Sequence, residues 1–578
     1  MAVLGVDVGG TFTDAVLIGD GELRTAKVRT LRRQEESVLA AALALGAAEI
    51  ERFTHGTTVA TNALLERKGA RTAFVTTAGF EHMLHLRRQN RADLYRLCAA
   101  HPEPLVPLER CYGVCERMGP DGVIERLDLE SIPEVEAEAV AVCLLFSFRD
   151  ARHEQVVADE LRRRLPGAHV VASHEVAPEF REYERASTAA ADAYLGPVLA
   201  EYLLALGRRC EQAGLPQPLV LRSSGGVSSL EEAAAHASWA LLSGPAGGVV
   251  GAAKIAELAG FSDAISFDMG GTSTDVCLIS GGAAERSAER TIAGFPIRLP
   301  SVDVHTVGAG GGSVAWVDAG GALRVGPESA GADPGPACYG LGGRRPTVTD
   351  ANLLLGRVPT RLADGLELDR SAAEEALDGL QAADVIDVVN AEMLRAIRVV
   401  SVERGQDPRD FALVAFGGAG PLHACSLAEE LGIETVLAPT AAGVLSALGL
   451  AVGEERRDHV RTEVRPLTEV GELPGEGEAD LRYKGQSFEL TLPLGSRLTD
   501  RFHRLHEQRY GYANPARELE LVAVRTAERR PGPELALPAG RRETALGPEV
   551  IDLEGATCWL PPGWVGVRDG GVWSLARA

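Results

Sequence analysis

The chain has 578 residues, of which 45% are hydrophobic and 24% charged, as in ordinary globular proteins. Its 81 acidic residues outnumber the 58 basic ones, and the formal charge of −23 argues against nucleic acid or an anionic membrane as main partner, because both require concentrated positive surface. We find no stretch long and apolar enough to span a bilayer and no secretory leader, and the nine scattered cysteines suggest reduced thiols, so we expect a cytoplasmic protein.

The first predicted element is an apolar strand that ends in Asp7, followed by a Gly-Gly-Thr-x-Thr turn and a second strand opened by Asp14. The same pattern returns where one strand ends in Asp268 and the next is opened by Asp275. Glycines bring backbone amides close to an anion, and threonine hydroxyls add donors. A Gly-Gly turn alone only indicates a hairpin, but the repeated acids and threonines predict two phosphate-binding hairpins. Their predicted phosphate-binding residues are Gly9, Gly10, Thr11, Thr13, Gly270, Gly271, Thr272 and Thr274.

The two strand-ending acids are candidate metal ligands. Mg²⁺ prefers carboxylate oxygens and keeps several of its waters, so Asp7 and Asp268 could bind it directly or through water. Two facing hairpins with one Mg²⁺ suit a nucleoside triphosphate. We therefore predict that ATP and Mg²⁺ are the cofactors.

The repetition continues beyond the hairpins. Residues 218–221, which run into a Ser-Ser-Gly-Gly turn, match the strand and glycine turn of residues 411–421. Small-residue helical segments follow at 243–256 and 442–448. Strands rich in Val, Ile and Leu alternate with helical patterns, which predicts an α/β protein built from a duplicated unit.

A glycine turn after an apolar strand is the candidate adenosine site. Gly417, Gly418 and Gly420 precede a helix, and glycines there would let a base and ribose pack against the backbone. We predict three units: an N-terminal lobe at residues 1–190, a second lobe at 191–460, and a small α+β module at 461–578. The long glycine-rich segment at 307–343 is predicted to be a functional loop.

Several motifs in order resemble one enzyme family. They are Gly5–Asp14, His55–Ala63, Glu182–Arg185, Ser243–Gly247, Gly308–Ser313, Ala332–Gly340 and Thr347–Asn352. With both hairpins, they are similar to the hydantoinase A and 5-oxoprolinase subunits, within the actin, Hsp70 and sugar-kinase ATPase superfamily. The C-terminal motifs Tyr483-x-Gly485-Gln486 and His506–Tyr512 also resemble this family, although the C-terminal module is shorter than usual.

This resemblance implies a duplicated ribonuclease-H-like, actin-like ATPase fold with two lobes. It implies that ATP phosphorylates the carbonyl oxygen of a cyclic amide such as a hydantoin or 5-oxoproline. It also implies a companion hydantoinase B-type subunit, and hence a hetero-oligomer.

Two further residues are candidates for contact with the substrate. His55 could polarise the substrate carbonyl, or it could be a hydrogen-bonded histidine near a turn. Arg185 could clamp a phosphate or carboxylate in a bidentate manner, or it could form a salt bridge between the lobes.

Three other functions share these motifs. The chain could be the ATP-binding subunit of a ketone carboxylase of the acetone or acetophenone type. It could be an actin-like ATPase switch acting on a protein partner, or a small-molecule kinase. Analysis of the reaction products would distinguish these three functions from amide hydrolysis.

Overall fold

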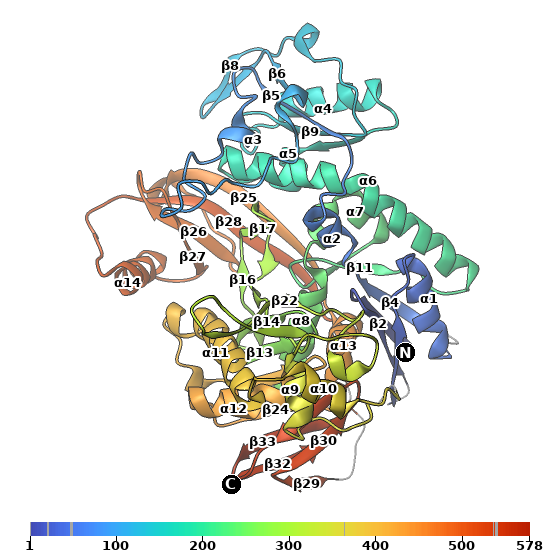
Figure 1. Ribbon diagram of the computed structural model, residues 1–578. Helices are drawn as coiled ribbons and strands as arrows, with labels where there is room; N and C mark the ends of the chain where they lie inside the picture. Colours follow the sequence, from blue (N-terminus) through green and yellow to red (C-terminus); the bar gives the residue numbers. More distant parts are fainter. Residues whose placement is uncertain (1, 20–21, 47–49, 363–364, 536, 538–541) are drawn as a thin grey trace.

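The computed structural model describes the whole chain except residues 1, 20–21, 47–49, 363–364, 536 and 538–541. Two large sheets form two lobes, and a small four-stranded sheet sits beyond the first lobe (Figure 1). The small sheet has the order β10-β9-β5-β6. Its strands are β5 (Thr72–Thr77), β6 (Cys111–Val114), β9 (Ala139–Cys143) and β10 (His169–Ala172).

The first large sheet carries the first hairpin. Its order is β27-β26-β28-β25-β12-β11-β4-β1-β2-β3. In chain order the strands are β1 (Ala2–Val8), β2 (Phe12–Gly19), β3 (Glu22–Arg29), β4 (Ile50–Gly56), β11 (Leu219–Leu221), β12 (Val227–Ser228), β25 (Glu455–Pro466), β26 (Glu478–Tyr483), β27 (Leu490–Pro493) and β28 (Leu519–Arg530). Strands β1, β2 and β3 are antiparallel, whereas β4 and then β11 run parallel to β1.

The second large sheet repeats this arrangement around the second hairpin. Its order is β15-β14-β13-β23-β24-β33-β32-β29, and β20 also pairs with β14. The strands are β13 (Ala264–Met269), β14 (Thr274–Ser280), β15 (Ala283–Ala284), β20 (His305–Val307), β23 (Ala412–Phe416), β24 (Val436–Pro439), β29 (Glu543–Leu546), β32 (Trp564–Asp569) and β33 (Val572–Arg577). Strand β23 is parallel to β13 and β24 is parallel to β23, so the duplicated unit is present in both sheets.

One predicted correspondence between the halves is wrong. The sequence pattern pairs residues 218–221 with residues 411–416, but in the sheets β4 occupies the position of β23, and β11 occupies that of β24. The strand at 218–221 was chosen because a Gly-Gly turn follows it. Strand β4 was overlooked because its turn, Gly56-Thr57-Thr58, has a single glycine.

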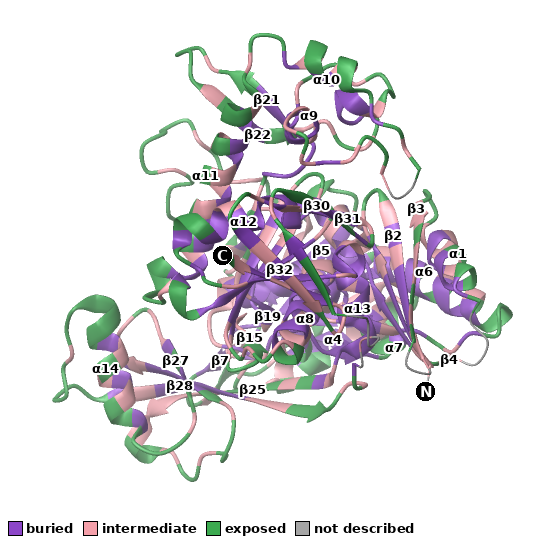
Figure 2. Ribbon diagram, turned by 90° about the horizontal axis from the view of Figure 1, so that it is seen from below, coloured by how far each residue is buried: buried purple, intermediate pink, exposed green. Residues whose placement is uncertain are grey.

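One helix from each lobe packs on the sheet of the other lobe. Helix α8 (Ser243–Leu258) packs on β13 and β14, and α13 (Leu445–Val452) packs on β1 and β2. The two helices touch at glycines, where a β-carbon on Gly449 would overlap the Gly247 carbonyl oxygen and lie 2.6 Å from Gly251 N. Figure 2 shows the buried residues concentrated around this crossing.

The C-terminal part differs from the single module predicted for residues 461–578. Strands β25, β26 and β28 join the first sheet, and β29, β32 and β33 extend the second. With α14 (Leu498–Tyr510), strands β25–β28 form an arm that projects from the lobes (Figures 1 and 2). Alternating polar and apolar residues revealed the strands but not which sheet each strand would join.

The predicted boundary at residue 190 falls inside a helix. Helix α6 (Glu182–Gln212) runs through it without a break. By length and composition alone this helix could cross a membrane, contrary to the sequence analysis, but 67% of its most apolar stretch is buried inside the protein. Its Leu195, Leu199 and Leu203 belong to the core of the first lobe, so α6 is a core helix.

Other helices cover the second lobe and the small sheet. Helix α11 (Ala382–Val400) contacts β14 and α12 (Gly420–Leu431), and α12 packs on β23. Helix α4 (Arg152–Arg164) covers β9 and β10. The hairpin of β30 (Glu549–Leu553) and β31 (Ala556–Leu560) lies against α12.

Candidate nucleotide site between the two hairpins

The two hairpins have the same backbone geometry. In the first, Gly9 N donates to Phe12 O at 2.9 Å; in the second, Gly270 N donates to Ser273 O at 3.0 Å. Asp7 pairs across the strands with Asp14, and Asp268 pairs with Asp275. The tips at residues 10–11 and 271–272 are exposed, so their amides and the two threonine hydroxyls can meet a phosphate.

The carboxylates of the two lobes lie within electrostatic reach of each other. Burial first, and Asp14 second, raise the pKa of Asp7 to about 7. Burial, then Asp275, then Asp7 raise the pKa of Asp268 to about 8. Two carboxylates that face each other across a strand pair repel, and this repulsion destabilises the fold unless a positive charge lies nearby. This is an environment that a cation would stabilise.

The acids fit Mg²⁺. Asp7 Oδ1 is buried and has no hydrogen-bond partner among the described residues, which is costly unless a ligand binds it. No group of three or more His, Cys, Asp or Glu side chains in the described part of the chain could hold a metal alone. Asp7 and Asp268 would therefore bind Mg²⁺ together with water and phosphate oxygens, the ligand set that Mg²⁺ favours in nucleotide sites.

Lys27 is a site residue that the sequence analysis missed. Its Nζ lies 2.6 Å from Asp14 Oδ1 and 3.3 Å from the carbonyl oxygen of Gly443, so it joins strand β3 of the first lobe to the second. It lowers the pKa of both Asp7 and Asp268. No motif surrounds Lys27; only the strand order places it opposite Asp14.

Two of the predicted phosphate-binding threonines are not available to a ligand. Thr13 Oγ1 lies 3.0 Å from Thr30 Oγ1, and Thr274 Oγ1 donates to Ala309 O at 2.5 Å. Both side chains are fully buried. Thr13 lies on the same face of β2 as the buried Ala15, and Thr274 lies on the same face of β14 as the buried Val276, so both hydroxyls stabilise the hairpins from inside.

The glycine-rich segment predicted as a functional loop supports the second hairpin. Gly311 N donates to Gly270 O at 2.9 Å, and Gly312 N donates to Gly271 O at 2.7 Å. A β-carbon on Gly310 would lie 2.6 Å from Thr272 N. The loop therefore donates hydrogen bonds to the carbonyl oxygens of the hairpin, while the amides at the hairpin tip stay exposed.

The predicted adenosine turn is only partly open to a ligand. Gly417 has φ +76°, and a β-carbon there would overlap Asp268 Oδ1, so this glycine makes room for the carboxylate. Gly420 is buried beneath Phe267 O, and Gly418 is exposed. Of the three glycines, Gly418 is therefore the one that can face a nucleoside.

The first lobe offers a helix N-terminus as a second phosphate contact. Helix α8 begins at Ser243, and a β-carbon on Gly244 would lie 3.7 Å from Asp7 Oδ1. Ser243 Oγ donates to Thr57 O at 2.9 Å, which ties this helix end to the turn after β4. The free amides of a 16-residue helix favour an anion at this position.

His55 lies beneath the site rather than in it. Its side chain is fully buried; its Nδ1 lies 3.2 Å from Val6 O, and its Nε2 lies 2.8 Å from the Tyr202 hydroxyl. Burial lowers the pKa of His55 to about 4. The imidazole is thus neutral with both nitrogens occupied, and the interpretation as a hydrogen-bonded histidine near a turn describes it.

Arg185 is also internal. Its side chain is fully buried next to the small sheet, where Nη1 donates to Ser173 Oγ at 3.0 Å and Nη2 to Leu144 O at 2.9 Å. It also pairs with Glu182 and lies 3.9 Å from Glu154. Neither a substrate clamp nor a bridge between the lobes fits this position, because all of these partners come from residues 144–182.

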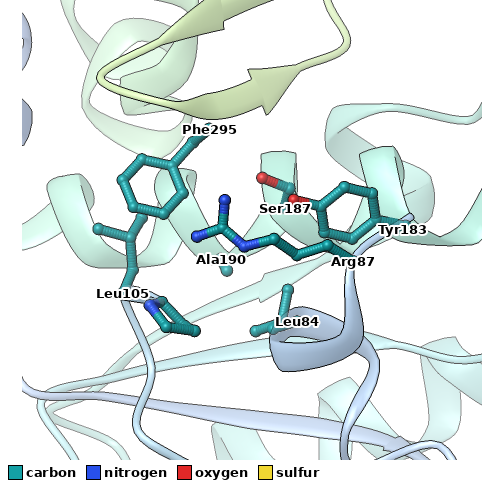
Figure 3. A pocket seen from close by; sticks show the side chains of 8 residues that line it. Leu84, Arg87, Leu105, Tyr183, Ser187, Ala190 and Phe295 are labelled. Atoms are coloured by element: carbon teal, nitrogen blue, oxygen red, sulfur yellow. The ribbon is translucent and has the colours of Figure 1, made fainter. Parts of the chain in front are cut away.

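A small cavity near the start of α6 is not a ligand site. Figure 3 shows Arg87 among Leu84, Leu105, Tyr183 and Phe295. The cavity measures about 10 Å³, which is room for one water at most. Arg87 donates to Pro102 O and holds the neighbouring loop in place.

Comparisons with known proteins agree with the two-lobed arrangement. Residues 3–165 match the model of the hydantoinase/oxoprolinase N-terminal region, and residues 185–459 match that of hydantoinase/oxoprolinase. Caprolactamase subunit alpha of Pseudomonas jessenii is 34% identical, with 97% of each chain covered. The acetophenone carboxylase gamma subunit of Aromatoleum aromaticum is 34% identical over 77% of this chain and 67% of that one. The crystal structure of ATP-dependent caprolactamase from Pseudomonas jessenii superimposes with a TM-score of 0.87 at 31% identity, covering all of both chains.

Proposed function

Because the chain belongs to the hydantoinase/oxoprolinase family, we propose that it is the ATP-using subunit of an enzyme that hydrolyses a cyclic amide. The observation that carries this proposal is the pair of facing acid hairpins, together with similarity to an ATP-dependent caprolactamase along the whole chain. An amide carbonyl is a poor electrophile, so ATP would be used to activate it before water attacks.

The site residues would position the phosphates. The exposed hairpin amides and the N-terminus of α8 would bind phosphate oxygens, and Gly418 would face the nucleoside. Asp7 and Asp268 would hold Mg²⁺, which neutralises charge on the phosphates when it is bound. Lys27 would keep Asp14 paired while the lobes are together.

The proposed reaction is phosphoryl transfer. The carbonyl oxygen of the amide would attack the γ-phosphorus, forming one P–O bond as the bond to ADP breaks. A first water would then attack the activated carbon, and the C–N bond would break as the nitrogen takes a proton, leaving an acyl phosphate. A second water would break its C–O bond to phosphate, giving the carboxylate and inorganic phosphate. We propose that a B-type partner subunit assists this second stage, since the relatives named above are subunits.

Ketone carboxylation is the second candidate. The similarity to the acetophenone carboxylase gamma subunit favours it, and an enolate oxygen could accept the same phosphoryl group. The product distinguishes the two: amide hydrolysis gives an amine and a carboxylate on one molecule, whereas carboxylation consumes bicarbonate and gives a keto acid.

Substitution of either strand-ending acid tests the site. Asp7→Asn or Asp268→Asn should lower ATP turnover by about 10²-fold or more, because the paired ligand of the cation is lost. Asp192→Asn is the control, since Asp192 is a buried aspartate whose pKa burial also raises to about 7, but its carboxylate accepts from Ala237 N and Ser238 Oγ away from the hairpins. Full ATP turnover in Asp268→Asn would contradict the two-hairpin site.

A second experiment tests the need for a partner. The purified chain should bind Mg-ATP, while amide opening should require addition of the B-type subunit. Rapid lactam hydrolysis by the chain alone, measured by the release of a primary amine, would refute the proposed partner.

A further inference from the structure

The turn after β4 and the short helix that follows it lie beside the first hairpin. Helix α2 (Val59–Leu65) begins just after this turn, and Figure 1 shows it beneath α6, which it contacts. Gly56, the last residue of β4, pairs with Asp7 of β1. A β-carbon on Gly56 would lie 2.7 Å from Asp7 Oδ1. The start of α2 is therefore close to the acid that we assign to Mg²⁺.

One face of α2 is turned toward the start of α8. Thr61 Oγ1 accepts a hydrogen bond from the amide of Leu242, the residue before α8, at 3.1 Å. Thr58 and Asn62 lie on the same side of α2 as Thr61, because residues three and four apart are neighbours on a helix, and both are half-buried. The opposite side, which includes Leu64, packs in the core of the first lobe. Thr58 and Asn62 thus border the end of α8 that we assign to phosphate.

The side chains of Thr58 and Asn62 leave two hydrogen-bonding groups open. Thr58 is the N-cap of α2, where a threonine hydroxyl normally accepts from an amide of the first turn, but this hydroxyl makes no such bond. It lies instead 3.4 Å from Asn62 Nδ2. Asn62 Oδ1 and the hydroxyl proton of Thr58 therefore have no partner among the described residues. The pair presents one acceptor and one donor.

This acceptor and donor match one edge of a cyclic amide. A small lactam ring holds its N–H and its C=O on the same side, so both point toward one wall of a site. Asn62 Oδ1 can accept from the N–H while the Thr58 hydroxyl donates to the C=O. A ketone has no N–H and would leave Asn62 Oδ1 unpaired.

We propose that Asn62 and Thr58 select a secondary cyclic amide and position its carbonyl oxygen for phosphoryl transfer. The inference rests on the proposed function and names the residues that choose its substrate. A hydrogen bond accepted from the N–H shifts electron density onto the carbonyl oxygen, which makes that oxygen a better nucleophile. The proton stays on nitrogen in this step, as the oxygen forms its bond to the γ-phosphorus and the bond to ADP breaks.

Saturation-transfer NMR on the full chain, with Mg²⁺ and a non-hydrolysable ATP analogue, tests the assignment. The probes are 2-pyrrolidone, N-methyl-2-pyrrolidone and cyclopentanone, which share a ring size and a carbonyl but of which only the first has an N–H. We expect 2-pyrrolidone to bind about tenfold more tightly than either analogue, because it alone pairs with Asn62 Oδ1. Asn62→Leu should abolish this preference. Thr58→Val should weaken all three probes alike, because all three carry the carbonyl.

Three further variants serve as controls. Asn62→Asp keeps an acceptor oxygen and should keep the preference for the N–H. Glu66→Gln changes an exposed residue at the end of the same helix, which pairs with Lys68 at 2.6 Å, and should leave the binding of every probe unchanged. Should Asn62→Leu fail to fold, Asn62→Ala is expected to lose the preference in the same way.

Equal binding of 2-pyrrolidone and N-methyl-2-pyrrolidone, or no binding of any probe, would overturn the inference. So would a preference for the N–H that persists in Asn62→Leu. Tighter binding of cyclopentanone would overturn it as well and would favour ketone carboxylation. A chain that uses ATP to open lactams but gives one of the first two results loses this inference alone. A chain that shows the expected preference but consumes no ATP with any lactam loses the proposed function instead.

Discussion

The two hairpins carry almost the same residues, yet their surroundings differ. In the first lobe, Thr30 donates from its amide to Thr11 O and from its hydroxyl to Gly9 O, both at 2.9 Å. In the second lobe, a glycine-rich loop covers the hairpin, with backbone in contact with backbone. The repeated sequence therefore specifies the turn and its acids, and the unrepeated residues determine how firmly each hairpin is held.

The largest difference between the lobes is expected at the glycine beside each acid. In Gly417→Ala the new β-carbon would overlap Asp268 Oδ1 and lie 2.6 Å from the Met269 carbonyl oxygen, at a positive φ that alanine disfavours. In Gly56→Ala the contacts are side-chain atoms, Asp7 Oδ1 at 2.7 Å and Leu450 at 3.1 Å, which can move. We expect ATP turnover to fall about 10²-fold in Gly417→Ala and about tenfold in Gly56→Ala. Equal losses in a steady-state assay would mean that the two acids have equivalent surroundings.

Weakening the backbone contacts that hold each hairpin should produce a smaller difference in ATP binding between the lobes. Gly310→Ala forces the backbone at Thr272 to shift, so the KM for ATP should rise roughly tenfold. Thr30→Val removes the hydroxyl that donates to Gly9 O, a bond worth about 1 kcal/mol, and that contacts Thr13 Oγ1, while the Thr30 amide still donates to Thr11 O. We expect the KM for ATP to rise about fivefold. Initial rates over a range of ATP concentrations measure both. A larger effect in Thr30→Val would reverse the comparison.

The last difference between the lobes concerns the pH dependence of stability rather than ATP turnover. His55 pairs with Val6 in the first lobe, and the equivalent residue of the second lobe, paired with Phe267, is Ala415. The pKa of His55 is about 4 in the folded protein, below the 6.5 of a free histidine. Below pH 6.5 the unfolded chain binds a proton at His55 that the folded chain does not bind. The free energy of unfolding therefore falls as the pH drops from 6.5 toward 4. Between pH 7 and 5 this amounts to about 2 kcal/mol.

Urea unfolding of His55→Gln at both pH values measures this contribution. The free energy of unfolding of the variant should vary less between pH 7 and 5 than that of the unmodified chain, by the amount above. His82→Gln changes an exposed histidine and serves as the control. An unchanged pH dependence in His55→Gln would show that His55 is not a buried neutral base.

The sequence predicted the elements that repeat. Asp7, Asp268 and the Gly-Gly-Thr turns recur at two places, so a pattern could be seen without coordinates. Lys27 and the second-lobe contact of Gly443 could not be predicted, because they depend on which strand lies beside which. Thr13 and Thr274 were assigned to phosphate by residue type, and only the alternation of side chains along a strand places them inward. His55 and Arg185 belong to motifs that resemble those of the family, but both side chains are fully buried, and their hydrogen bonds inside the protein decide their roles.

The crossing of α8 and α13 has a consequence for how the chain can be divided. Each helix packs on the sheet of the opposite lobe, and the two meet at Gly247 and Gly449. Cutting the chain between the lobes would strip each sheet of its covering helix and expose apolar strands such as β1 and β13. The two halves should therefore be insoluble when expressed separately and should reassemble when expressed together, so that the duplicated unit behaves in folding as a single cooperative body.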